Sequence, residues 1–161
     1  MFTIPADFFK ATPTITNGTA YASGDLIGGK LTFTNAVLSS QRHAEIVGGV
    51  LYDSSKQSAD VDLVIFSADP TATTFTNDSA FAVHADDLQK VVAVIKFRST
   101  DYVPFSANSV GIVDNTSKKF RSTGTASPFD AVYGALVSRG TPTYTSTTAL
   151  TVGLTIIQNV R

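Results

Sequence analysis

The chain has 161 residues, a length typical of one domain, with a formal net charge of −1, two histidines and no cysteine. The nearly balanced charge argues against nucleic-acid or anionic-membrane binding through a global positive field, and the lack of cysteine excludes disulfides, thiolate zinc sites and iron–sulfur clusters. Charged residues make up only 16% of the chain, and abundant threonine and serine favour strands over helices.

The first part of the chain shows little strand pattern. Residues 1–10 combine a Phe8-Phe9 pair with a nearby proline, and only residues 12–16 are a weak strand candidate. We therefore predict that residues 1–19 form an N-terminal arm that contacts another subunit, and that residues 20–161 form a single domain. The opening residues lack a cationic leader followed by an apolar stretch, so no secretory signal peptide is expected.

Apolar and polar residues alternate repeatedly from residue 20 onward. Residues 31–34 and 150–156 alternate apolar residues with threonine, as strands with one buried face do. Residues 61–66, 91–97 and 131–137 are more continuously apolar, which predicts central strands that are covered on both faces. The longest apolar runs are much too short for a membrane-spanning helix, so no membrane partner is expected.

Three further segments complete the predicted elements. Residues 45–52 and 110–113 are weaker strand candidates, and the Gly48-Gly49 pair in the first suggests a bulge. Residues 85–90 are predicted to form one short helical turn with acidic residues at its start. Residues near 104–130 are predicted to form a long loop. Together the pattern predicts an all-β fold, a two-sheet antiparallel β-sandwich of jelly-roll or Greek-key-like topology rather than a closed barrel.

The motif that looks most like a ligand site is residues 24–30, which match the G-x-x-x-x-G-K pattern of phosphate-binding loops. Such a loop needs a buried strand before it, a helix after it and a hydroxyl-bearing next residue, whereas here Leu31 and an alternating strand follow. The sequence therefore predicts a glycine-rich turn that enters a strand.

Other candidate chemistry is sparse. His43 and His84 stand apart from any nucleophile motif, so both are interpreted as loop or cap residues. Asp60 and Asp62 lie two apart on a predicted strand and supply too few oxygens for a calcium loop. The basic residues 118–121, which surround one phenylalanine, are interpreted as a solvated loop, with an acidic protein surface as the next alternative and nucleic acid last. No catalytic, cofactor-binding or metal-binding residue is predicted, and no cofactor.

Three longer segments, residues 21–36, residues 60–70 with 74–77, and residues 136–146, resemble the capsid decoration, or cement, proteins of tailed bacteriophages. Typical stretches are YASGDLIGGKLTFTNA and LVSRGTPTYTS. The likeness covers most of residues 20–157 in the same order, whereas the first residues and residues 104–130 fit less well. The resemblance implies a β-sandwich that binds the outside of a phage head as a homo-oligomer, clamps neighbouring major capsid proteins and carries no catalytic residues. It also implies a location on the outer surface of the virion, after synthesis in the host cytoplasm.

A surface clamp needs aromatic anchors at its interfaces. Six aromatic residues lie in segments without a strong strand pattern, and we predict that they contact other subunits: Phe8, Phe9, Tyr102, Phe105, Phe120 and Phe129. The alternative is that they are loop residues tucked into the core. The expected partners are the major capsid protein and further copies of the chain, as a homodimer or a homotrimer. An alternative function on the same fold is a glycan- or receptor-binding module of a phage tail.

Overall fold

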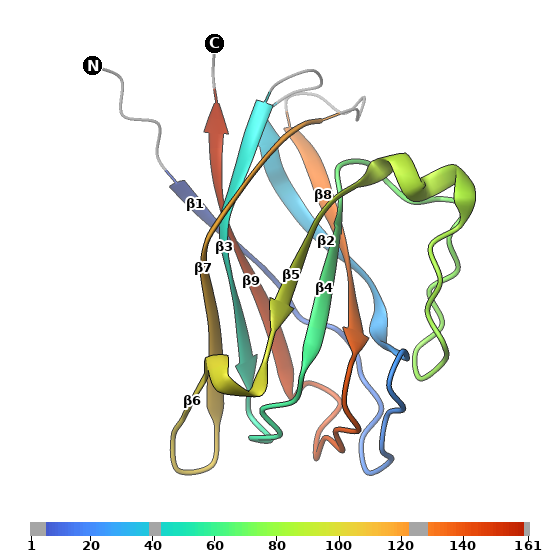
Figure 1. Cartoon of the computed structure of the whole chain (residues 1–161), viewed down its shortest axis with the longest axis vertical. Coiled ribbons are helices and arrows are strands. Elements are labelled where there is room, and N and C mark those ends of the chain that lie inside the picture. The colour runs from blue at the N-terminus through green and yellow to red at the C-terminus, as the bar shows by residue number, and fades with distance from the viewer. Residues whose placement is uncertain (1–5, 39–42, 123–128, 160–161) are drawn as a thin grey trace.

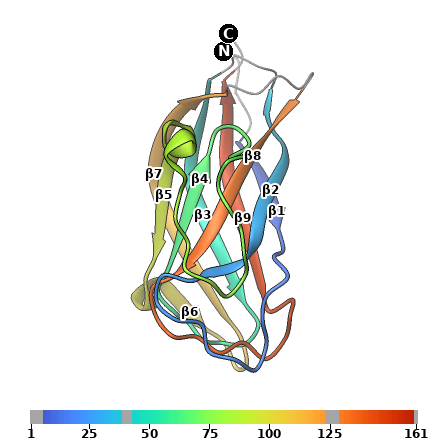
Figure 2. The ribbon, with the colours of Figure 1, turned by 90° about the vertical axis from the view of Figure 1, so that its right-hand side faces the viewer.

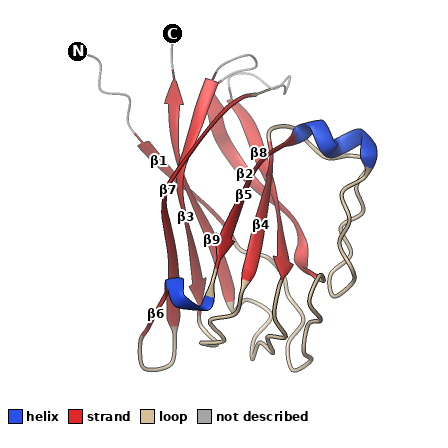
Figure 3. Ribbon diagram, viewed as in Figure 1, coloured by secondary structure: helices blue, strands red, loops and turns tan. Residues whose placement is uncertain are grey.

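The computed structural model describes residues 6–38, 43–122 and 129–159 and consists of two antiparallel β-sheets packed face to face (Figures 1 and 3). The strands and the two short 3-10 helices are β1 (Ala6–Ala11), β2 (Leu26–Leu38), β3 (His43–Asp53), β4 (Val61–Phe66), η1 (Ala85–Lys90), β5 (Val91–Phe97), η2 (Ser99–Asp101), β6 (Tyr102–Pro104), β7 (Ser109–Arg121), β8 (Phe129–Ser138) and β9 (Leu150–Asn159).

The strand order identifies the topology. One sheet has the order β1-β9-β3-β7-β6 and the other the order β2-β8-β4-β5. Apart from the short β6, the pairs are nested, because β4 pairs with β5, β3 with β7, β2 with β8 and β1 with β9. This arrangement is one long antiparallel ribbon that is folded over into two sheets, which is a jelly roll. The predicted β-sandwich is therefore confirmed, with its jelly-roll topology.

The main core lies between the sheets and follows the period-two pattern of the sequence. In β2, Leu31 and Phe33 point inward and are buried, while the intervening threonines are exposed. In β9, Val152, Leu154 and Ile156 are buried in the same way. Both ladders of β3 shift their register between Ile46 and Gly48, so the predicted bulge is present. The helical turn predicted at residues 85–90 is η1.

Two segments that were expected to lack strands are strands. Residues 6–11 pair with β9 as β1, whereas residues 12–16 form no strand. Ile15 is buried, and its N–H donates to Thr147 O at 3.0 Å, so this segment packs on the domain and does not project as an arm. Within the predicted long loop, residues 109–121 form β7, which pairs with β3 on both sides of a register shift at residues 115–117. Residues 1–5 and 123–128 lie outside the described part of the chain.

The position of β5 is a third correction. Residues 91–97 were expected to form a central strand, but β5 is at the edge of the four-stranded sheet. Ala93, Ile95 and Phe97 are buried in alternation with the exposed Val94 and Lys96. The apolar side chain of Val94 hid this alternation in the sequence. The other two segments predicted as central, β4 and β8, are inner strands of this sheet.

Candidate interaction surface

The six aromatic residues predicted to contact other subunits lie in different environments. Phe8 on β1 is 42% exposed, and Phe105 in the β6–β7 hairpin is 57% exposed. Phe9 is partly buried against the main core. Tyr102 and Phe120 are buried core residues, and the side chain of Phe129, at the start of β8, lies outside the described structure. Of the five side chains in this set that the structure describes, only Phe8 and Phe105 are therefore exposed at the surface.

Tyr102 is buried because β6 pairs with β7. Its ring lies over Gly111, where a Cβ would come within 2.9 Å of the ring. Its hydroxyl donates to Ala59 O at 2.8 Å, and burial raises the pKa of Tyr102. Phe120 faces the core from β7 while Lys118 and Lys119 are exposed. The basic residues 118–121 therefore lie on a strand, and their phenylalanine is not available to stack on a nucleic-acid base.

The structure shows a larger surface that the sequence did not reveal. The register places Val103, Val110 and Tyr52 in one cross-strand row on the outer side of the five-stranded sheet, and Ile112 and Val50 in the next row. Ile112 is 46% exposed and Val103 51% exposed, and the other three are partly exposed. Together with Phe8 at the β1 edge, these residues form what we call the apolar sheet face, defined by Phe8, Val50, Tyr52, Val103, Val110 and Ile112.

The ring of Phe8 lies over a glycine of the neighbouring strand β9. A Cβ on Gly153 of β9 would overlap the ring of Phe8, so the ring occupies the space above that residue. Lys10 Nζ lies 5.5 Å from the ring centroid of Phe8 and 5.5 Å from that of Tyr52. These contacts tie the β1 edge to the centre of the sheet.

The outer face of the four-stranded sheet differs because the chain covers it. The segment of residues 67–84 folds back across this sheet (Figure 2). Phe75 and Phe81 pack there against a second apolar cluster that includes Phe66, Val64 and Val137. One outer sheet face is thus buried under the protein's own loop, while the apolar sheet face has no such cover within the described residues.

One carboxylate fastens this loop. The side chain of Asp87 on η1 is 1% exposed and accepts hydrogen bonds from the backbone N–H groups of Ala72 and Thr73 at 3.0 and 2.7 Å, and from the Thr73 hydroxyl at 2.7 Å. Lys90 Nζ lies 2.7 Å from its other oxygen and also donates to Asp69 O at 2.7 Å. The acidic residue expected merely to favour the start of a helix therefore holds the loop against the sheet.

The loop should loosen in acid. Burial alone would raise the pKa of Asp87, but the hydrogen bonds from Lys90 and Thr73 outweigh it and lower the pKa from 3.8 to about 2. Because the folded pKa is depressed, the stabilisation is complete above about pH 5 and is lost as the pH falls through 3.8 towards about 2. We expect the amide resonances of Ala72 and Thr73 to titrate in nuclear magnetic resonance spectra with a midpoint near 2, and D87N to abolish that titration. A midpoint near 3.8, the ordinary value, would contradict this assignment.

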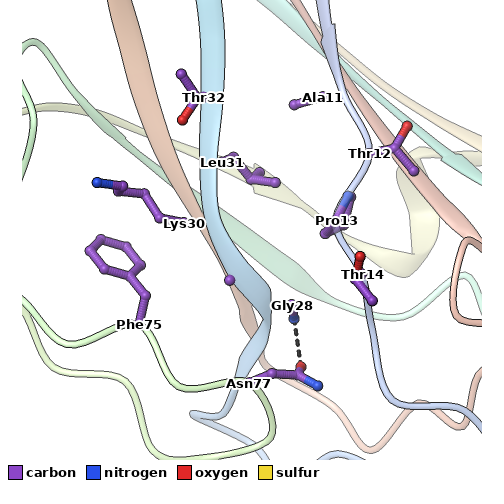
Figure 4. A pocket seen from close by; sticks show the side chains of 11 residues that line it. Ala11, Thr12, Pro13, Thr14, Gly28, Lys30, Leu31, Thr32, Phe75 and Asn77 are labelled. Carbon is purple, nitrogen blue, oxygen red and sulfur yellow. Dashed lines mark hydrogen bonds between the residues drawn. The ribbon is translucent and has the colours of Figure 1, made fainter.

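A groove of about 560 Å³ lies between residues 11–14, the strand segment 28–32 and the loop residues Phe75 and Asn77 (Figure 4). Asn77 Oδ1 accepts from Gly28 N at 2.7 Å and from the Tyr21 hydroxyl at 2.8 Å, and Asn77 Nδ2 donates to Thr16 Oγ1 at 2.7 Å. Asn77 is thus a structural clamp between three segments, and nothing in the sequence indicated this role.

The remaining candidate residues form ion pairs, cap a helix or lie in strands. The turn predicted at residues 24–30 is mostly strand, because β2 begins at Leu26 and its ladder shifts register between Ile27 and Leu31. Lys30 pairs with Asp69 at 2.6 Å. His84 caps η1 by accepting from Asp86 N at 3.2 Å, and His43 begins β3. Asp62 pairs with Arg98 and Arg139. Among the residues that the structure describes, no three His, Cys, Asp or Glu side chains are grouped as a metal site would require.

Comparison with known proteins identified no relative of this chain. No protein-family model matches the chain, and no curated protein or solved structure matches it significantly. In the described part of the chain, no helix has the length and apolar character needed to cross a membrane.

Proposed function

We propose that this protein is a structural component of a bacteriophage head, which binds the outer surface of the shell and clamps neighbouring major capsid proteins. The proposal rests on the resemblance of residues 20–157 to capsid decoration proteins and on one structural observation, the apolar sheet face. Contiguous exposed apolar surface on a folded domain marks a site of contact with another macromolecule. The partner is then a protein surface of matching shape, because the face has few charges.

The shape of the apolar sheet face suits a clamp. The apolar sheet face extends across the five-stranded sheet from Phe8 on β1 to Val103 on β6 and is backed by the rigid main core. A rigid strand framework holds such contacts in place without loss of backbone freedom on binding. A protein that binds the assembled shell but not its free subunits stabilises the shell by mass action.

Ile112→Lys should weaken binding to undecorated expanded heads by about ten-fold or more, because it places a charge within the proposed contact. Val94→Lys is the matched control, because Val94 is 42% exposed on the other sheet and Ile112 is 46% exposed. Co-sedimentation measures binding, and the disruption temperature of the heads measures stabilisation.

The wild-type protein should bind the heads and raise their disruption temperature. Absence of binding, or equal weakening by the two lysine variants, would contradict the proposal. The copy number in purified particles separates this function from the tail alternative, because hundreds of copies indicate shell coating, whereas a few copies indicate a tail part.

A further inference from the structure

The four sheet edges in the described structure differ in how well they are protected against further strand pairing. Edge strands expose unpaired N–H and C=O groups, and proteins usually block them with prolines, bulges, short strands or covering segments. The edge strand β6 has three residues and ends at Pro104. The edge strand β2 has two register shifts in its ladder and a positive φ of 59° at Asn35. The edge strand β5 packs beside β7 of the opposite sheet.

The fourth edge, β1, has no proline and no register shift and is longer than β6, although it lies beside β2 of the opposite sheet as β5 lies beside β7. Its six residues, ADFFKA, contain no proline or glycine. Its ladder with β9 runs from Ala6 to Ala11 without a register shift. Its residues are mostly exposed, and Phe8 continues the apolar sheet face to this edge. Within the described residues, β1 is therefore a regular edge strand that pairs with another strand on one side only.

The sequence of β1 is complementary to itself in one antiparallel register. A twofold axis perpendicular to the sheet keeps each residue on its own face, so only residues that point to the same face can lie opposite one another. The favoured register places Phe8 opposite Lys10 of the second copy, Asp7 opposite Ala11, and Phe9 opposite Phe9. The two neighbouring registers place Lys10 opposite Lys10, or Asp7 opposite the ring of Phe9. Like charges directly opposite each other are unfavourable, whereas a lysine beside an aromatic ring is favourable.

We propose that β1 is a self-association edge at which two copies of the chain pair their β1 strands antiparallel, in the register that places Phe8 opposite Lys10, and so form one continuous sheet across the dimer. Lys10 already lies 5.5 Å from the Phe8 ring of its own chain, so the pairing extends an existing contact to a second ring. Each copy would also gain main-chain hydrogen bonds along its free edge, as in strand addition.

The twofold axis gives the pairing a consequence for docking, which rests on the proposed function. The apolar sheet faces of both copies point to the same side, side by side, because the axis is perpendicular to the sheet. Two linked faces bind a regular shell with an effective local concentration that one face lacks. The dimer would therefore be a bivalent clamp that spans two capsid subunits.

The solution mass measured by light scattering and sedimentation over a range of concentrations tests the pairing. The wild type should be a dimer. Phe8→Lys places a new lysine opposite Lys10 of the second copy at both ends of the interface and should weaken dimerisation by about ten-fold or more. The double variant F8K/K10E should restore the dimer, because each new lysine then faces a glutamate. Val94→Lys, which changes a residue of the same 42% exposure on another edge, should leave the mass unchanged.

A monomeric wild type, or an F8K dimer as tight as the wild type, would overturn the proposal, and failure of the double variant to restore the dimer would overturn the register. The chain has no cysteine, so crosslinking gives an independent test. A mixture of F8C and K10C chains should form a disulfide-linked dimer faster than either variant alone, and equal rates would contradict the register.

Binding to heads is measured separately. A wild-type dimer that does not bind heads would leave the pairing intact and refute the proposed function. A wild-type monomer that does bind heads would support the proposed function and refute the pairing of β1 strands.

Discussion

Replacing Gly28 with alanine is expected to lower the free energy of unfolding by about 2–4 kcal/mol, from backbone strain and overpacking together. Gly28 has a φ of 81°, a conformation that L side chains rarely adopt. A Cβ at this position would lie 2.5 Å from Pro13 Cβ and 3.4 Å from Thr14 O. The Gly28 N–H also donates to Asn77 Oδ1 at 2.7 Å, so β2 cannot move away without breaking that contact.

The neighbouring glycine provides the control for this prediction. A Cβ on Gly29 would meet nothing within 4 Å, and Gly29 has no positive φ. We expect Gly29→Ala to change the free energy of unfolding by less than about 0.5 kcal/mol. Urea unfolding followed by circular dichroism measures both variants. Equal losses for the two variants would contradict the prediction, because neither the positive φ of Gly28 nor its contact with Pro13 would then resist a Cβ.

Asp62→Asn is expected to destabilise the protein by about 1.5–3 kcal/mol, because it removes the common partner of two arginines. Asp62 Oδ1 accepts from Arg98 at 2.8 Å and Asp62 Oδ2 from Arg139 at 2.7 Å, and the carboxylate is 8% exposed. Burial alone would raise the pKa of Asp62, but the hydrogen bonds and charges of Arg139 and Arg98 outweigh it and lower the pKa. An asparagine would present an N–H donor to one of the two guanidinium groups.

Asp69→Asn is the control for the buried carboxylate. Asp69 pairs with Lys30 at 2.6 Å, but the two side chains are 41% and 34% exposed, so the loss should stay below about 1 kcal/mol. Thermal unfolding at neutral pH compares the two variants. If D62N lowers the stability no more than D69N does, water stabilises the two arginine side chains as well as Asp62 does, and the prediction is wrong.

Much of the fold could be predicted from the sequence because inward and outward residues alternate along most strands. The limits of β4 and β5 agree with the predicted segments, and the bulge in β3 follows from its glycine pair. The two missed strand regions, β1 and the second half of β7, lack that alternation. Both regions are mostly exposed to solvent, so their strand conformation depends on pairing with β9 and β3, which local sequence does not encode.

The candidate surface was harder to predict than the fold. Tyr102 and Phe120 were expected at an interface because their segments resembled loops. Both are buried instead, because β6 pairs with the adjacent β7 and β7 pairs with the distant β3. The sequence indicates Val50 and Tyr52 only as part of a weak strand. The useful signal is that residues 50–52 are apolar at successive positions, which places apolar side chains on both faces of β3. Which of the two outer sheet faces of the sandwich is left uncovered depends on where residues 67–84 fold, and that is a long-range property.

The place of β9 in the jelly roll has a consequence for how the chain is made. β9 is the last described strand in chain order, yet it lies between β1 and β3 within its sheet. During synthesis, β1 therefore has no strand of its own sheet to pair with until residues 150–159 have left the ribosome. Long-range pairing of this kind slows folding and leaves unpaired strands exposed to aggregation in the meantime. A nascent chain stalled before β9 should consequently be protease-sensitive and prone to aggregate, and emergence of β9 should be the step that allows the native sheet to close.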